Sequence, residues 1–548
     1  MQKTKSKRIL FSLCSIFIPL ITFAQENDSL TFSEKIDIIF RDYTGWFVDL
    51  IFYEIPFSDD FQIPWVLILL IGGAIYFSVY FKLINFTGFG TAIKVVMGKY
   101  EDIEKHGVDT LYADPTPNEG EDLPETLRNE GADGEVSHFQ ALTAALSATV
   151  GLGNIAGVAV ALSIGGPGAT FWMIVAGLLG MASKFAECTL GVKYRDVGPD
   201  GTVYGGPMYY LKKGLKEKNM GGFGKVLAVV FSIFVIGGSF GGGNMFQANQ
   251  AAAQFTKLFG LEGGNAGFYF GIIMAILVAV VIIGGIKRIA SVTEKIVPFM
   301  AGIYVLGALV ILGANWMYID DAFGLIFKGA FSGLGIAGGL VGVMIQGIRR
   351  GAFSNEAGVG SAAIAHSAVR TKYPASEGIV ALLEPFVDTV VICTMTALVI
   401  VITNFHIGFL EYGTEVTEGV ELTATAFDSV IPHFSIVLTI AVILFAFSTM
   451  ISWSYYGMQG WKYLFGKGKV TDLVYKILFL FFVIVGASIS LGSVINFSDA
   501  MIFAMVVPNI TGVLLLTPVI RRELKRYMNA INKKEEALEE GATDYNKL

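Results

Sequence analysis

Long apolar runs separated by short polar connections dominate the chain. Runs of about 18 to 25 apolar residues match the length with which a helix crosses a hydrocarbon core of about 30 Å. Clear examples are Trp65–Phe81, Phe268–Ile286, Leu438–Trp453 and Ile477–Leu491. The pattern predicts about eleven membrane spans, at residues 63–83, 137–162, 168–192, 226–255, 267–285, 291–314, 327–348, 376–403, 431–456, 471–492 and 497–519.

Two segments precede the first span. Residues 1–24 combine Lys3, Lys5, Lys7 and Arg8 with an apolar core from Ile9 to Phe23, the pattern of a signal peptide that is cleaved after Ala24. The alternative is an uncleaved extra helix. Residues 25–62 are expected to form a periplasmic or interfacial segment, with an amphipathic helix over Ser33–Phe57.

The charges of the connections predict the orientation, because cytoplasmic loops are enriched in Lys and Arg. The basic connections are Lys193–Lys225, Lys287–Arg288, Arg349–Lys372, Lys462–Lys469 and the tail from Arg521. The segment from Asn404 to Pro432 is acidic and contains neither Lys nor Arg. We therefore expect the mature N-terminus outside the plasma (inner) membrane and the C-terminus in the cytoplasm. Residues 63–520 form the transmembrane domain, 97–135 a cytoplasmic loop and 521–548 a cytoplasmic tail.

Composition supports this class. Of the 548 residues, 53% are hydrophobic and 16% are charged, against about 25% charged in soluble proteins. Cys14, Cys188 and Cys393 are widely spaced, which excludes a metal-ligand motif. There is no nucleophile arrangement or phosphate-binding loop, so we expect neither an enzyme nor a partner of nucleic acid. The partners are the lipid bilayer and a small solute, and a monomer is expected.

The second span carries "SATVGLGNIAGV", residues 147–158. In a continuous helix Gly151 and Gly153 would each cost about 1 kcal/mol relative to alanine, and Asn154 would need buried partners. Non-helical backbone at membrane depth is tolerated only inside the protein or along a cavity, so an interruption predicts a binding site. Glycine is also dense in the seventh span, at Phe331–Gly347. Two interrupted helices at matching positions predict an inverted-repeat transporter, with repeats at about 137–314 and 327–519. The alternative is that these glycines only allow close helix packing.

A broken helix exposes N–H groups that suit a carboxylate and carbonyls that suit Na⁺ or an ammonium group. The fourth span adds Asn244, Gln247 and Asn249. The ninth adds Ser448, Thr449, Ser452 and Trp453 within about one helical turn. Each hydroxyl taken alone could instead bond to its own helix.

Charged residues within or near the spans are few. Lys184 and Glu187 have i,i+3 spacing and are expected to neutralise each other at a helix end, and Glu384 and Asp388 lie four residues apart. Arg349, Arg350 and Glu356 are expected at the cytoplasmic edge, as a gate or loop anchor. We find no evident carboxylate at mid-membrane, which favours Na⁺ coupling over a proton relay.

Two blocks, Ser137–Arg195 with "VGLGN" and Arg349–Ala368 with "RRGAFSNEAGVGSA", resemble the alanine or glycine:cation symporter family. The resemblance implies an all-α membrane protein in which one extra helix precedes a LeuT-like inverted repeat of five plus five helices. It implies import of small neutral amino acids, alanine and glycine, with Na⁺ as the coupling ion and no organic cofactor.

The resemblance also implies site residues. Those expected to bind substrate are Gly151, Gly153, Asn154, Phe240, Asn244, Gln247, Thr449 and Trp453. The carbonyls of Ser147, Val150 and Phe445, with Ser448 and Thr449, are expected to bind Na⁺. The alternatives are a LeuT-like transporter for another solute or coupled to H⁺, and a channel or solute receptor.

Overall fold

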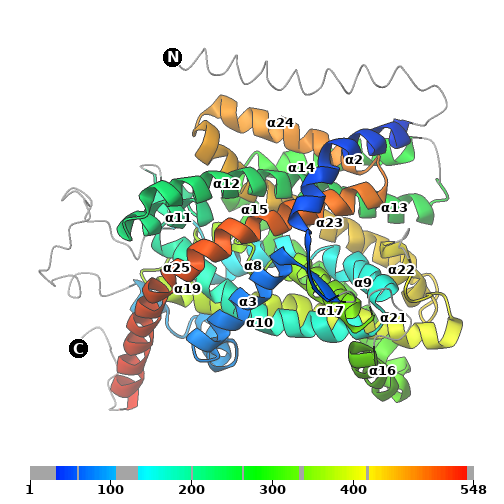
Figure 1. Ribbon diagram of the computed structural model, residues 1–548, viewed down its shortest axis with the longest axis horizontal. Coiled ribbons are helices and arrows are strands. Elements are labelled where there is room, and N and C mark those ends of the chain that lie inside the picture. The colour runs from blue at the N-terminus through cyan, green and yellow to red at the C-terminus, as the bar shows by residue number, and fades with distance from the viewer. Residues whose placement is uncertain are drawn as a thin grey trace, which may run out of the picture.

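The computed structural model describes residues 32–58, 61–105, 134–198, 201–261, 265–332, 339–414 and 419–539. Helices pack around one another throughout this part of the chain, and α25 (Leu491–Glu539) crosses the bundle and projects beyond it at its C-terminal end (Figure 1). The predicted signal peptide lies outside the described residues, as do most of the predicted cytoplasmic loop and the last residues of the tail.

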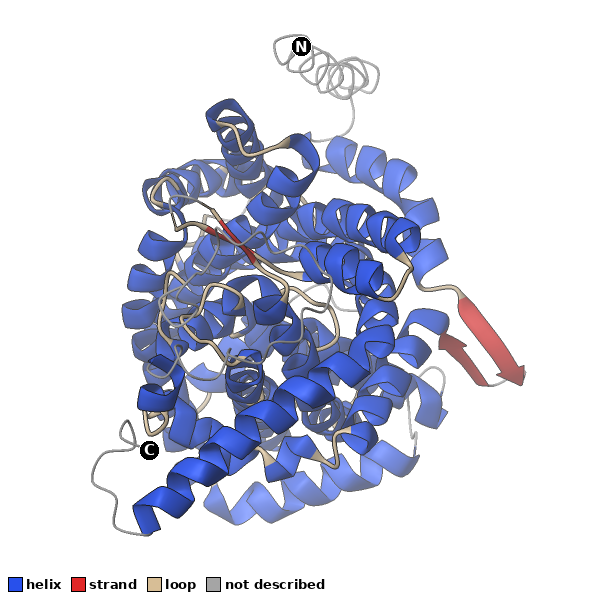
Figure 2. Cartoon of the chain, turned by 90° about the vertical axis from the view of Figure 1, so that its left-hand side faces the viewer, coloured by secondary structure: helices blue, strands red, loops and turns tan. Residues whose placement is uncertain are grey.

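The N-terminal segment differs in part from the prediction. Helix α2 (Phe32–Ile51) ends before Phe57, and strands β1 (Glu54–Ser58) and β2 (Phe61–Pro64) form an antiparallel hairpin that projects from the bundle (Figure 2). Pro56 and Pro64 lack a backbone N–H, which disfavours continuing the helix through this stretch. Three short helices follow α3 (Trp65–Tyr80): α4 (Ile84–Thr87), α5 (Phe89–Val96) and α6 (Glu101–Lys105).

Both predicted repeats are helical. The first contains α8 (His138–Thr149), η1 (Gly153–Gly157), α9 (Val158–Gly165), α10 (Gly168–Lys193), β3 (Asp196–Val197), β4 (Val203–Tyr204), α11 (Pro207–Glu217), α12 (Gly221–Phe240), η2 (Gly241–Met245), α13 (Phe246–Leu258), α14 (Ala266–Ile282) and α15 (Gly285–Ala314). The second contains η3 (Trp316–Tyr318), α16 (Ile319–Ser332), α17 (Gly339–Asn355), α18 (Ala362–His366), α19 (Pro374–Ala381), α20 (Leu383–Pro385), η4 (Phe386–Cys393), α21 (Thr394–Ile407), α22 (Val420–Asp428), α23 (Phe434–Phe465), α24 (Lys469–Gly486) and α25.

Within the described residues, six helices are long and apolar enough to cross a membrane, and a seventh span is added when α8 and α9 are counted as one bent pair. Each of the eleven predicted spans overlaps a helix. However, α3 and α14 are shorter than a full span, and α17 ends at Asn355, where the helical backbone is interrupted. A multispanning helical protein is therefore confirmed, while the exact number of spans is not.

The break predicted in the second span is present. A capping box of Ser137 and Gln140 starts α8, and the helix ends at Val150, whose φ of −72° and ψ of 86° leave the helical region. The two halves of this span meet at an angle of 51°.

The second break lies C-terminal to the predicted position. Left-handed backbone occurs at Glu356 (φ 54°), Gly358 (φ 82°) and Gly360 (φ 91°), between α17 and α18. A conformation with positive φ favours glycine over other residues. The predicted break at 331–347 falls partly on residues 333–338, outside the described residues.

Close packing explains the glycines that precede this break. A Cβ added at Gly347 would lie 2.4 Å from Ala169 O, and one added at Gly180 would lie 2.7 Å from Ala357. Helix α17 therefore runs beside the first half of α10, and the break lies near the middle of α10. The packing interpretation is the correct one for Gly347.

Backbone hydrogen bonds tie the start of α8 to the segment after α18. Glu135 N donates to Ala368 O at 2.7 Å, and Arg370 N donates to Val136 O at 2.9 Å. Val136 and Val369 form an isolated parallel bridge there. The segment that precedes the first break is thus joined to the segment that follows the second break.

Candidate functional site

The two breaks lie side by side in the protein interior. A Cβ added at Gly153 would lie 3.5 Å from the Cα of Ser354, the penultimate residue of α17. Gly153 is buried, and Ser354 is 2% exposed. Segments about 200 residues apart in sequence thus form one buried region.

Asn154 organises the first break and explains why a buried amide is kept there. Its Oδ1 accepts a hydrogen bond from Gly151 N at 2.9 Å, and its Nδ2 donates to Asp388 Oδ1 at 2.6 Å. Asp388 also accepts from the hydroxyls of Ser354 at 2.8 Å and Thr389 at 2.7 Å. One amide side chain therefore connects the break to η4, and through Asp388 to α17.

Gln247 and Thr449 enclose the other side of the break. Gln247 Oε1 accepts from Leu152 N at 3.2 Å, while its Nε2 donates to Gly242 O at 3.0 Å. A Cβ added at Gly151 would lie 2.5 Å from Thr449 Oγ1 and 3.3 Å from Gln247 Oε1. The structure thus brings together four of the eight residues predicted to bind substrate: Gly151, Asn154, Gln247 and Thr449.

Hydrogen bonds join four of the five residues predicted to bind Na⁺. Thr449 Oγ1 donates to Ser147 O at 3.0 Å, Ser147 Oγ donates to Ser448 O at 2.8 Å, and Ser448 Oγ donates to Phe445 O at 3.0 Å. Val150 lies at the bend. The polar atoms of this group are all oxygens, the ligand type that suits a hard cation.

Phe240 and Asn244 do not join this region. The Phe240 ring stacks on Phe482 of α24 at 4.7 Å between centroids, and Asn244 Nδ2 donates to Phe479 O at 2.7 Å. Both side chains lie on the face of α12 and η2 that packs against α24, so their expected role in substrate binding is not supported.

Trp453 lies at the second break. Its indole Nε1 donates to Glu356 Oε1 at 2.9 Å, and a Cβ added at Gly243 would clash with the indole at 2.2 Å. Glu356 is 3% exposed and accepts a hydrogen bond from Ser361. A carboxyl group expected at the cytoplasmic edge is therefore buried beside a predicted substrate residue.

The other charged residues also depart from expectation. Lys184 lies inside α10 and pairs with Glu384 at 3.0 Å rather than neutralising Glu187 at a helix end. Arg349 pairs with Asp499 at 2.8 Å, and Arg350 contacts the same carboxylate. Both arginines lie on the part of α17 that packs near the start of α10, away from Lys193, so they do not mark the edge where the basic loops lie.

Three carboxylates that the sequence places within or near the spans are buried in the bundle. Asp388, Glu187 and Glu384 are all fully buried. Their signal was present in the sequence, since an ionisable residue inside a membrane helix is by default a functional candidate. Amino-acid spacing alone could not show which of them meet, because their contacts join different helices.

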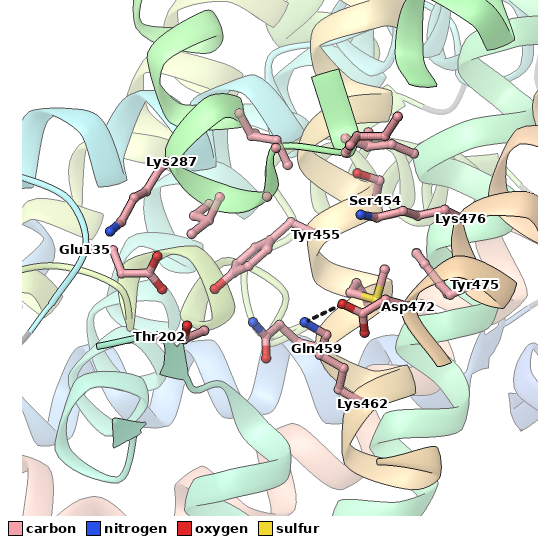
Figure 3. A pocket seen from close by; sticks show the side chains of 17 residues that line it. Glu135, Thr202, Lys287, Ser454, Tyr455, Gln459, Lys462, Asp472, Tyr475 and Lys476 are labelled. Atoms are coloured by element: carbon pink, nitrogen blue, oxygen red, sulfur yellow. Dashed lines mark ion pairs between the residues drawn. The ribbon is translucent and has the colours of Figure 1, made fainter. Parts of the chain in front are cut away.

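A cavity of about 330 Å³ opens beside the C-terminal half of α23 (Figure 3). Ser454 and Tyr455, which directly follow Trp453, line it together with Lys287, and Lys462 forms an ion pair with Asp472 at 3.1 Å across its rim. These lysines belong to the basic connections, so the cavity opens on their side of the bundle.

Comparison with known proteins gives the family. Residues 122–540 match the model of the sodium:alanine symporter family. The chain is 41% identical to the sodium/alanine symporter AgcS of Methanococcus maripaludis, over 86% of this chain and 96% of that protein. It is 34% identical to the probable sodium/glutamine symporter GlnT of Bacillus subtilis, over 72% of this chain and 78% of that protein.

The fold resembles that of MhsT, solved in complex with L-phenylalanine, with a TM-score of 0.53 and 14% identity. The match covers 72% of this chain and 93% of that structure. It establishes a LeuT-type transporter fold, and an enzyme is excluded. The chain is a member of the sodium:alanine symporter family, a group of Na⁺-coupled amino acid transporters.

Proposed function

We propose that the chain imports small neutral amino acids, alanine and glycine foremost, together with Na⁺, by alternating access to the region between the two breaks. The observation that carries the proposal is the meeting of Gly151–Asn154 with Ser354 in the buried interior. The N-terminal end of η1 and α9 suits the substrate carboxylate, and the oxygen cluster at the end of α8 suits Na⁺.

The surroundings of Gly151 favour a small substrate. Thr449 and Gln247 approach this glycine closely from two helices, and Trp453 fills the space over Gly243. The proposed substrate residues are therefore Gly151, Gly153, Asn154, Gln247, Thr449 and Trp453, and the proposed Na⁺ ligands are Ser147, Val150, Phe445, Ser448 and Thr449.

One Na⁺ supplies enough energy for accumulation. A tenfold Na⁺ gradient is worth about 1.4 kcal/mol, and a potential of 100 mV adds about 2.3 kcal/mol per charge. The total of about 3.7 kcal/mol supports an amino acid gradient of about 500-fold.

Access and location belong to the same proposal. The cavity beside α23 is the cytoplasmic route of release, and the Arg349–Asp499 pair lies on the outer side. We propose a monomer in the inner membrane, with a cleaved signal peptide, the mature N-terminus outside and the C-terminus in the cytoplasm.

The test compares two glycine variants in proteoliposomes. Gly151→Ala places a methyl group against Thr449, whereas Gly313→Ala, in α15, meets nothing within 4 Å. We expect Na⁺-driven uptake of radiolabelled alanine to fall about 100-fold in Gly151→Ala and to be unchanged in Gly313→Ala.

Competition defines the substrate class in the same assay. Unlabelled glycine and alanine should block uptake, and glutamine, for which the relative GlnT is named, should compete weakly. Uptake that is indifferent to Na⁺, or equal uptake by both variants, would contradict the proposal.

A further inference from the structure

Buried charged side chains connect Glu356 to the end of the bundle at α6. Glu104 contacts His138 Nε2, and the other ring nitrogen of His138 contacts Glu377. Glu377 in turn contacts Nδ1 of His366, which is fully buried. Tyr527 donates to Glu104 at 2.8 Å where this series begins.

The series continues to the second break. His366 Nε2 lies 3.5 Å from Glu384 Oε2, and Glu384 Oε1 accepts from Lys184 at 3.0 Å. Lys184 interacts electrostatically with Glu187 and Glu356. The buried charged array consists of Glu104, His138, Glu377, His366, Glu384, Lys184, Glu187 and Glu356.

The array has an excess of carboxyl groups. It contains five glutamates against two histidines and one lysine, so it would be net negative even with every base protonated. Burying uncompensated charge is costly. Glu187 Oε1 has no hydrogen-bond partner among the described residues. His366 Nε2 and Glu384 Oε2, which face each other, also have none there. Unused acceptors and excess negative charge are the conditions under which a site takes up protons.

We propose that Glu356 is a proton-binding site, loaded from the end of the bundle at Glu104 through the two histidines, Glu377, Glu384 and Lys184. The ligand is the proton itself. In the part of the chain that the structure describes, no group of His, Cys, Asp and Glu is arranged to hold a metal ion.

The transfer balances at each step. A hydronium ion gives its proton to Glu104 and leaves as water, and each imidazole accepts a proton at one ring nitrogen and releases one from the other. Glu384 passes its proton to Lys184 as the ammonium releases one to Glu356. Two links are open and need a small movement of side chains. The facing atoms of His366 and Glu384 are 3.5 Å apart, and Lys184, whose ion pair is with Glu384, must approach Glu356 to pass the proton on.

The charge of Glu356 affects several neighbouring groups. Trp453 and Ser361 donate hydrogen bonds to the Glu356 carboxyl group. Lys184, Glu384 and Tyr456 of α23 lie near enough to interact with it electrostatically. A proton on the oxygen that faces Ser361 would reverse that hydrogen bond. Protonation therefore changes both the charge and the bonding beside Trp453, and its effect on transport rests on the proposed function.

At the surface end, Tyr100 does not contribute a proton. Burial and a hydrogen bond to Glu535 raise the pKa of Tyr100 to about 12. The contact between Glu104 and His138 forms the outer end of the array, where the side chain of His138 is 14% exposed and that of Glu104 is 3% exposed.

The experiment is infrared difference spectroscopy of the full-length protein in detergent, without Na⁺ or amino acid, after a change of pH between about 5 and about 9. The probe is the proton. Wild type should show a change in the carboxylic-acid C=O band that is absent in Glu356→Gln and retained, at a shifted frequency, in Glu356→Asp. The matched control Glu421→Gln removes a carboxyl group that pairs with Lys257 outside the array, and should leave the band unchanged.

A pH jump tests the path. In His366→Gln the same band should appear about tenfold more slowly than in wild type, while His406→Gln, whose ring packs on Tyr318, should match wild type. A band that persists in Glu356→Gln, or an unaltered rate in His366→Gln, would overturn the proposal. Because no Na⁺ or amino acid is present, either result is independent of the proposed transport function.

Discussion

Asn154 joins the first break to η4 with one side chain. It accepts from Gly151 N and donates both to the backbone carbonyl and to the carboxylate of Asp388. Without it, a buried N–H at the break and a buried carboxylate would each lose a partner. An unsatisfied buried group costs about 1–3 kcal/mol, so this residue sets the geometry of the break.

We therefore expect Asn154→Ala to reduce Na⁺-driven alanine uptake by about 10- to 100-fold, as follows from a loss of about 1–3 kcal/mol. The measurement is initial uptake into proteoliposomes, normalised to the folded protein by size-exclusion chromatography. Asn315→Ala is the matched control, because Asn315 bonds only to Ile311 O within α15. Equal uptake by both variants would show that the break does not depend on this amide.

Single residues could be predicted where the local pattern has one meaning. An amide within "VGLGN" of an apolar span indicates a break and buried partners, and the partners exist. The identity of those partners could not be predicted, since Asp388 and Ser354 lie more than 190 residues away. Asn244 was predicted from the same polar cluster as Gln247, and Phe240 from the family resemblance, but both side chains contact α24 instead.

Among the elements, the two breaks were unequally predictable. The first has glycines beside an asparagine, a combination that packing does not explain. The second has Gly358 and Gly360 at positive φ within a polar stretch that resembles a loop. Gly347 of the preceding helix packs against α10, so glycine density alone did not indicate the break at Glu356–Gly360.

The pairing of α17 with α25 gives a prediction for these two helices. Asp499→Asn leaves Arg350, which is 3% exposed, without its anionic partner. Breaking a buried pair on one side costs about 3–5 kcal/mol. We expect a lower melting temperature and faster amide hydrogen exchange in residues 339–355, measured by mass spectrometry.

Glu421→Gln serves as the control, because its pair with Lys257 is partly solvent-exposed and such pairs are worth about 0–1 kcal/mol. Its exchange in residues 339–355 should equal that of wild type. Unchanged exchange in Asp499→Asn would mean that the arginines find other partners and that the pair does not close the outer side.

For the whole molecule, charge divides the two ends of the bundle. Lys193 pairs with Glu523 near the end of α10, and Arg521 lies over the Tyr80 ring where α3 ends. Two basic connections, the one that begins at Lys193 and the tail from Arg521, therefore lie near each other, whereas Arg349 and Arg350 lie beside the opposite part of α10. Loop charge remains the basis of the predicted orientation, because insertion follows loop charge rather than tertiary contacts.

A fusion experiment tests the orientation. Green fluorescent protein joined after Leu548 should fluoresce, because it folds in the cytoplasm, and alkaline phosphatase at the same position should be inactive. Replacing Arg521, Arg522, Lys525 and Arg526 by glutamine should reduce the fluorescence of the fusion. An active phosphatase fusion of the unaltered chain would reverse the orientation.

The backbone bridge between Val136 and Val369 has a mechanical consequence. It fastens the start of α8 to the segment that follows α18, so the inner parts of the two broken spans cannot swing apart without losing several backbone hydrogen bonds. We therefore expect the two segments to move as one unit about the breaks at Val150 and at Glu356–Gly360. A change in the tilt of α8 should therefore move the segment after α18 as well, and with it the second break beside Trp453.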